Sequence, residues 1–192
     1  MNFTNKTVIV TGGARGIGRA IVNAFAESGA DVVISDLRCQ EAKTAALNTS
    51  ETFQRCVIAV QTDVTKHEDV ERLRDETLRQ FGKIDVLINC AGWDRLLPFT
   101  KTTPDLWQKI LSINFLGVAN MCHAILPAMV ERKQGAIVNI SSDTGRVGSF
   151  GEAIYASSKA AIMAFSKTIA RTRARQHSRQ CCLTRTLRHA FD

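Results

Sequence analysis

Short runs of β-branched residues alternate along this chain with longer segments in which apolar residues recur at helical spacing. That alternation is typical of a parallel sheet whose strands are joined by helices. The predicted fold class is therefore α/β, a doubly wound parallel sheet in one domain over residues 1–171. The expected strands are Thr7–Thr11, Asp31–Ser35, Val57–Thr62, Asp85–Asn89 and Ala136–Ile140, and the expected helices are Gly16–Ser28, Gln40–Thr52, Lys66–Phe81, Pro104–Arg132 and Glu152–Arg171.

Glycines and prolines mark the ends of these elements. Gly29, Gly82 and Gly135 come just after three predicted helices, where a left-handed residue is favoured. Pro127 stands inside the long helix Pro104–Arg132, and we expect it to bend or break that helix.

Composition indicates an ordinary globular protein, with 45% hydrophobic and 22% charged residues in 192. The N-terminus is too short and too polar for a signal sequence, and no apolar run approaches membrane-spanning length, so a cytoplasmic location is expected. The six cysteines lack paired spacing, which is typical of reduced intracellular thiols.

A net charge of +7 can indicate a nucleic-acid partner, but most of this charge lies in the C-terminal tail. Six arginines and one aspartate between Arg171 and Asp192 contribute +5, which leaves +2 for the rest. The basic tail has no interleaved aromatic residues, so a nucleic-acid-binding protein is an alternative that we do not favour. The spacing of its possible ligands does not match a zinc site either, and no metal is expected at His177, Cys181, Cys182 and His189.

A glycine-rich turn follows the first predicted strand and opens the first predicted helix. It contains Gly12, Gly16 and Gly18. Glycines here allow positive φ and a close approach of the backbone to a pyrophosphate, while the helix N-terminus offers free N–H groups. The sequence therefore predicts a dinucleotide site of the Rossmann type, with a purely structural turn as the alternative.

Asp36 closes the second predicted strand. A carboxylate at that place in a Rossmann fold accepts both ribose hydroxyls of NAD and repels the extra phosphate of NADP. NAD is therefore favoured over NADP, although Arg15 and Arg38 could attract a 2′-phosphate. The alternative is a solvated carboxylate at a strand end.

Tyr155 and Lys159 are four residues apart on a predicted helix and so share one face. A phenol titrates near pH 10, and an adjacent ammonium favours the phenolate and lowers its pKa. Such a tyrosine can exchange a proton with an alcohol as its hydride leaves. The alternative is an ordinary surface pair.

These motifs together resemble the short-chain dehydrogenase/reductase family. The spacing Gly12-x-x-x-Gly16-x-Gly18, and four further motifs in the same order, extend the resemblance over Lys6 to Ala170. It implies an oxidoreductase that interconverts a secondary alcohol and a ketone with NAD. The roles it implies are substrate binding by Ser142, acid/base catalysis by Tyr155, ribose orientation and lowering of the Tyr155 pKa by Lys159, and retention of a proton-relaying water by Asn114.

The resemblance also implies the cofactor contacts. Asp63-Val64 resembles the adenine-contacting pair, and Asn89-Cys90-Ala91-Gly92 resembles a strand end in which Cys90 replaces the usual asparagine. The expected cofactor-binding residues are Gly12, Arg15, Gly16, Ile17, Gly18, Asp36, Asp63, Val64, Asn89, Ala91, Gly92, Tyr155 and Lys159.

Three loops indicate the substrate. Ala91–Asp94, Pro98–Thr102 and Arg146–Ala153 resemble the loops of family members that act on alicyclic acyl-CoA thioesters. A cyclic or short-chain hydroxyacyl-CoA is therefore the expected substrate. A 3-oxoacyl-thioester reductase, which would share every catalytic residue, is the alternative.

The resemblance ends at Thr172, and residues 172–192 contain no β-branched run for a sixth strand. Reading the possible codons from Thr172 one base later permits Val-Asn-Val-Val and then Pro-Gly-Pro, which resembles the strand and nicotinamide loop of the family. We interpret the tail as an aberrant basic segment, produced by a frameshift, that lacks native structure. The catalytic part would then be truncated after its last helix. A further alternative to the enzyme is therefore a non-catalytic relic that at most binds nucleotide. The resemblance implies a homo-oligomer for the full-length family, but we do not expect a truncated chain to form it.

Overall fold

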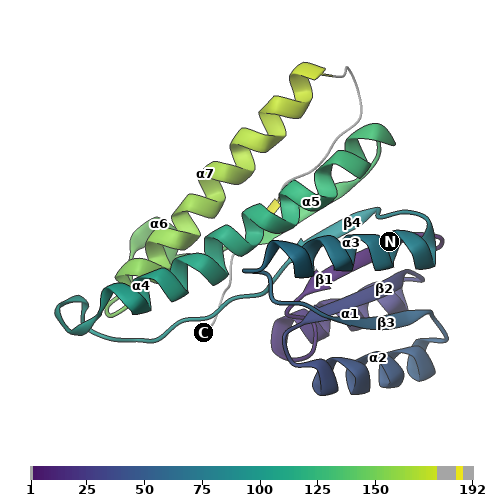
Figure 1. Cartoon of the computed structure of the whole chain (residues 1–192), viewed down its shortest axis with the longest axis horizontal. Coiled ribbons are helices and arrows are strands. Elements are labelled where there is room, and N and C mark those ends of the chain that lie inside the picture. Colours follow the sequence, from purple (N-terminus) through teal and green to yellow (C-terminus); the bar gives the residue numbers. More distant parts are fainter. Residues whose placement is uncertain (1, 177–184, 188–192) are drawn as a thin grey trace.

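The protein is built on one six-stranded parallel sheet, seen in a computed structural model that describes residues 2–176 and 185–187. The strand order is β3-β2-β1-β4-β5-β6, so the chain reverses its direction of winding between β1 and β4 (Figure 1). Residues buried in these strands are mostly valine and isoleucine, as expected when helices cover both faces of a sheet. The strands are β1 (Thr7–Thr11), β2 (Asp31–Asp36), β3 (Val57–Gln61), β4 (Val86–Asn89), β5 (Ala136–Ile140) and β6 (Arg185–Leu187).

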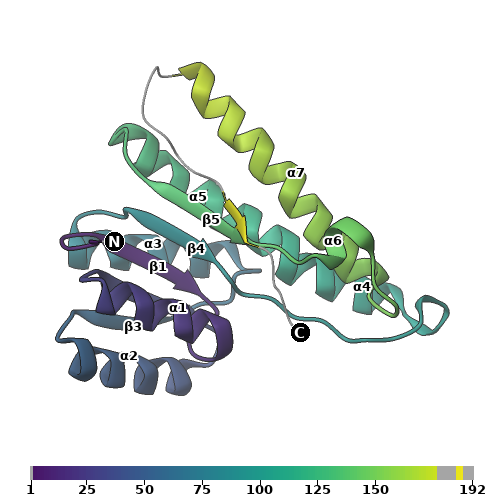
Figure 2. The same ribbon diagram turned by 180° about the vertical axis from the view of Figure 1, so that it is seen from behind.

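Two helical layers cover the sheet. Helices α1 and α2 pack on one face, where Val8 and Val10 of β1 join their core. Helices α3, α5 and α7 cover the other face, toward which Ile9 points (Figure 2). This alternation along β1 places the two cores on opposite sides of one sheet. The bounds are α1 (Gly16–Glu27), α2 (Cys39–Phe53), α3 (His67–Phe81), η1 (Phe99–Lys101), α4 (Pro104–Leu111), η2 (Ser112–Leu116), α5 (Gly117–Glu131), α6 (Thr144–Val147) and α7 (Ala153–Gln176).

The structure confirms the predicted α/β fold, with most boundaries within two residues of those predicted. Gly29 and Gly82 have φ of 93° and 70°, as expected after α1 and α3. Gly135 was wrongly expected to cap α5. The left-handed residue there is Lys133 (φ 54°), and Gln134 N–H closes the last turn on Met129 O at 3.1 Å.

The long helix is interrupted at a different place from the one predicted. Pro127 lies within α5, whereas the irregularity is the π-helical turn η2, which carries Asn114. Contrary to the sequence-based expectation, Pro104–Glu131 is long and apolar enough, by length and composition, to cross a membrane. Met121, Ile125 and Met129 are fully buried against the sheet, which accounts for much of its apolar character.

The tail departs from the expectation of no further strand. α7 continues to Gln176, five residues beyond the predicted end, and β6 pairs in parallel with β5 with Arg185 opposite Val138. The edge of β5 presents unpaired backbone groups, and a short extended segment satisfies them without a β-branched sequence. The rest of the tail, including the possible zinc ligands, lies outside the described residues.

Candidate active site

A cavity of about 780 Å³ lies at the carboxyl ends of the strands. In an open parallel sheet, ligands bind at this edge where the strand order reverses. The cavity extends from Asp36 and Arg38 past the glycine turn to Tyr155 and Lys159. All predicted cofactor-binding residues line it except Asn89.

The glycine turn is tightly packed on its inner side and open toward the cavity. Gly12 has φ of 68°, and its N–H donates to Ser35 O at 2.7 Å. A Cβ on Gly12 would come within 3.0 Å of Ala91 Cα, and one on Gly18 within 2.1 Å of Gly12 O. A Cβ on Gly16 would meet nothing within 4 Å. The turn therefore leaves room for a pyrophosphate where the helix N-terminus begins.

Asp36 is held with its carboxylate at the other end of the cavity. Oδ2 accepts from Ala14 N–H at 3.1 Å and Oδ1 from Arg38 N–H at 3.0 Å, and these bonds fix the carboxylate while leaving further lone pairs. Arg38 lies beside Glu41, with 3.6 Å between Nε and Oε1. This acidic neighbour reduces the pull of Arg38 on a 2′-phosphate.

The end of β4 is held by a residue that the sequence did not single out. Thr11 Oγ1 accepts from Cys90 N–H and Ala91 N–H, both at 3.0 Å, and so fixes the backbone beneath the cavity. The Asn89 side chain points into the core instead, where Nδ2 donates to Asn139 Oδ1 at 2.8 Å. Asn89 therefore supports the sheet, and its side chain is not placed to contact a cofactor.

Lys159 is a buried cation on the same face of α7 as Tyr155. Only 4% of it is exposed, and Nζ donates to Ile140 O at 3.0 Å. Its Nζ lies 5.5 Å from the centroid of the Tyr155 ring. Burial lowers the pKa of Lys159 to about 8. The structure thus brings together the pair that the spacing predicted.

Tyr155 does not have the lowered pKa that the sequence suggested. Burial raises the pKa of Tyr155, and the negative charges of Glu152 and Asp94 raise it further, while a hydrogen bond with Ser142 acts in the opposite direction. The expectation was wrong because it left out the burial of the phenol, which is the largest cause of the shift, and the two carboxyl groups from other loops. At neutral pH, Tyr155 is therefore a proton donor in this structure.

Ser142 is positioned by Thr144. Thr144 N–H and its hydroxyl donate to Ser142 Oγ at 3.3 and 3.0 Å. Since these bonds occupy the acceptor sites of Ser142, its own proton is free to point toward Tyr155 or a substrate oxygen. This arrangement agrees with the predicted role of Ser142 as a hydrogen-bond donor.

Asn114 is fully buried in the π-helical turn. Nδ2 donates to Trp93 O at 2.6 Å and to Ile110 O at 2.9 Å, and Oδ1 accepts from Trp93 N–H at 3.2 Å. Both amide protons are thus used to hold the loop after β4. A water relay at Asn114 stays a prediction, and the structure shows this residue as a buried amide at the irregular turn between α4 and α5.

Several cavity-lining residues were missed as individual site residues. They are Trp93 and Asp94 after β4, Lys109 on α4 and Glu152 just before α7. Lys109 Nζ lies 4.0 Å from the centre of the Trp93 ring. No local pattern marks them, because the contacts join loops that are far apart in the sequence.

These residues fit a nicotinamide dinucleotide. An open glycine turn faces the cavity, and a fixed carboxylate lies at one end with a tyrosine–lysine pair at the other. When bound, the nicotinamide supplies or accepts a hydride. In the predicted mechanism, Ser142 would orient the substrate oxygen and the Tyr155 hydroxyl would give or take its proton.

Comparison with known proteins agrees with this geometry. Residues 6–181 match the profile of the short chain dehydrogenase family. The chain is 36% identical over 181 residues to a 3-oxoacyl-acyl-carrier-protein reductase of Chlamydia trachomatis, covering 94% of this chain and 73% of the relative. It is 37% identical over 183 residues to the L-fucose dehydrogenase of Oryctolagus cuniculus, covering 95% and 62%.

A solved structure is also similar. The crystal structure of an NAD⁺-bound xylitol dehydrogenase superimposes with a TM-score of 0.89 at 30% identity, covering 98% of this chain and 70% of that one. The profile spans nearly the whole chain, and the similar solved structure shares its fold. This chain therefore belongs to the short-chain dehydrogenase family of oxidoreductases.

Proposed function

We propose that this oxidoreductase uses NAD(H) to interconvert a secondary alcohol and a ketone on a cyclic or short-chain hydroxyacyl thioester. The observation that carries the proposal is the single cavity lined by Asp36, the glycine turn, Tyr155 and Lys159. NAD is favoured because the carboxylate of Asp36 would accept ribose hydroxyls and repel a 2′-phosphate.

The thioester part rests on the substrate loops. Ala91–Asp94 and Arg146–Ala153 resemble those of 2-hydroxycyclohexanecarboxyl-CoA dehydrogenase, and both segments contribute to the cavity beside Tyr155. Reductases of 3-oxoacyl thioesters are among the similar proteins, which supports a thioester but leaves an acyl-carrier-protein substrate as a second candidate.

The test is a substrate panel followed through the absorbance of the reduced nicotinamide. It compares 2-hydroxycyclohexanecarboxyl-CoA, 3-hydroxybutyryl-CoA, the matching acyl-carrier-protein thioester, L-fucose and xylitol, each with NAD and NADP. We expect the highest kcat/KM with a CoA thioester and NAD. A preference for a sugar or polyol would overturn the thioester proposal, and a preference for the acyl-carrier-protein thioester would favour the second candidate.

A further inference from the structure

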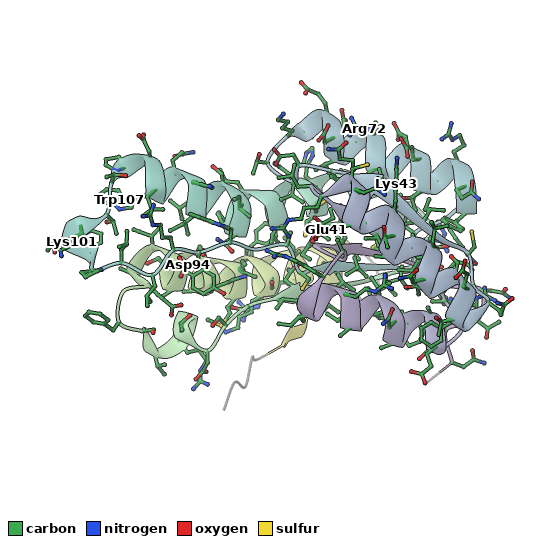
Figure 3. All side chains as sticks on the ribbon, turned by 90° about the horizontal axis from the view of Figure 1, so that it is seen from below. Glu41, Lys43, Arg72, Asp94, Lys101 and Trp107 are labelled. Carbon is green, nitrogen blue, oxygen red and sulfur yellow. The ribbon has the colours of Figure 1, made fainter. Side chains whose placement is uncertain are left out.

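Two carboxyl groups lie beside the catalytic tyrosine, and the catalytic scheme above does not use them. Asp94 belongs to the loop after β4, and Glu152 belongs to the loop before α7. Both line the main cavity together with Tyr155, and both also line a small adjoining pocket with Tyr155. Figure 3 shows Asp94 near the end of the molecule that carries Trp107, away from Lys43 and Arg72.

The two loops are held against one another. Leu97 N–H donates to Gly151 O at 3.0 Å, and a Cβ on Gly151 would come within 3.0 Å of Leu96. Gly151 has φ of 75°, which a side chain rarely adopts. The backbone therefore fixes the distance between the segments that carry Asp94 and Glu152.

The carboxyl groups interact directly. Burial raises the pKa of Asp94, a hydrogen bond with the backbone of Arg95 lowers it, and the charge and side chain of Glu152 raise it again. Asp94 Oδ1 is buried without a hydrogen-bond partner.

Two acidic side chains and the buried cation of Lys159 lie near Tyr155. Glu152 and Asp94 raise the pKa of Tyr155 through space, so both carboxyl groups act on the side of the cavity that holds its hydroxyl. The ammonium group of Lys159 donates to Ile140 O at the end of β5. It also lies close to Gly92 in the loop after β4, since a Cβ built on Gly92 would be 3.8 Å from Nζ. A carboxylate or phosphate next to the reacting carbon would therefore meet repulsion from the carboxyl pair.

We propose that Asp94 and Glu152 are specificity-determining residues, which admit a substrate whose reacting carbon is flanked by an uncharged group and reject one flanked by a carboxylate. This inference rests on the proposed function, because it explains why a hydroxyacyl thioester would be accepted and the corresponding free hydroxy acid refused. The uncharged flanking group can be a thioester, an ester or a hydroxyl group.

The test uses two ligands that differ in this charge and in one methyl group, methyl 3-oxobutanoate and 3-oxobutanoate. Their kcat/KM values with NADH, and their dissociation constants from ligand-observed NMR, are compared for the wild type and the double variant Asp94→Asn/Glu152→Gln. The amides keep the size of the carboxyl groups and their capacity to hydrogen-bond each other. The control double variant, Glu27→Gln/Glu131→Gln, removes two exposed carboxylates that do not line the cavity.

We expect kcat/KM of the wild type to be higher for the ester than for the acid. In Asp94→Asn/Glu152→Gln, the ratio of these two kcat/KM values should fall at least about tenfold, mainly because kcat/KM for the acid rises. The control should keep the wild-type ratio. Equal handling of both ligands by the wild type, or an unchanged ratio in the double variant, would overturn the proposal. Xylitol and xylonate form a second matched pair. Charge selection on that pair, without any thioester turnover, would refute the proposed substrate and leave the role of the carboxyl pair standing.

Discussion

Replacing Lys159 with methionine should stabilise the folded chain at neutral pH while impairing its site. The pKa of Lys159 falls from the ordinary 10.5 to about 8, so the unfolded chain binds more protons between those values. Stability then rises with pH through that window. The cost of burying the ammonium is fully present below about pH 8 and is lost toward pH 10.5.

The magnitude follows from the size of the shift. A change from 10.5 to about 8 corresponds to roughly 3 kcal/mol, because one unit is about 1.4 kcal/mol. With 4% of Lys159 exposed, solvent screening reduces this value little. Methionine also leaves Ile140 O without its donor, at a cost of about 1–3 kcal/mol at any pH. The net gain at pH 7 is therefore on the order of 1 kcal/mol.

Urea unfolding of the wild type and Lys159→Met at pH 7 and pH 10 measures the effect. The free energy of unfolding of the variant relative to the wild type should fall by about 2 kcal/mol between these pH values. Lys43→Met, an exposed lysine on α2, provides the control and should show no such dependence. A Lys159→Met effect that is equal at both pH values would refute the reasoning.

Other predictions concern the proton donor and the glycine turn. Tyr155→Phe should lower kcat by about two decades or more and leave the Kd for NADH nearly unchanged. The control Ser157→Ala, on the same helix, should leave both constants unchanged. Near-normal turnover in Tyr155→Phe would reject Tyr155 as the proton donor. Gly18→Ala should destabilise the chain by more than about 2 kcal/mol in urea unfolding, because its Cβ would overlap Gly12 O. Gly16→Ala has open space and should cost only about 1 kcal/mol for its positive φ, so equal losses in the two variants would contradict the described packing of the turn.

The fold could be predicted from the sequence because its signals are local. The strands β1 to β5 are short runs rich in β-branched residues, and helix ends such as Gly82 follow rules that act within one turn. The end of α5 was predicted to within one residue, but its left-handed residue was wrongly assigned to Gly135 because Lys133 adopts that conformation without being glycine. The break in the long helix was misplaced because the π-helical turn is stabilised by bonds from Asn114 to the distant Trp93.

The same distinction applies to the site. The glycine turn, Asp36 and the Tyr155–Lys159 pair could be found because the relevant residues are close in sequence or stand at a strand end. The direction of the Tyr155 pKa shift could not be predicted, since it depends first on burial of the phenol in the folded chain and then on Glu152 and Asp94, which reach the tyrosine from two other loops. The core position of Asn89 also depends on a partner in another strand.

The most direct test of the account is a titration with NADH and NADPH, followed by energy transfer from tryptophan to the reduced nicotinamide. Trp93 lines the cavity, so energy transfer from it reports occupation of this site, and the variant Trp93→Phe identifies its share of the signal. We predict that NADH binds about tenfold more tightly than NADPH or better, roughly the contribution of one hydrogen bond to a charged group, and that Asp36→Ala brings the two constants together. Tighter binding of NADPH by the wild type, or no binding of either cofactor, would contradict the central claim.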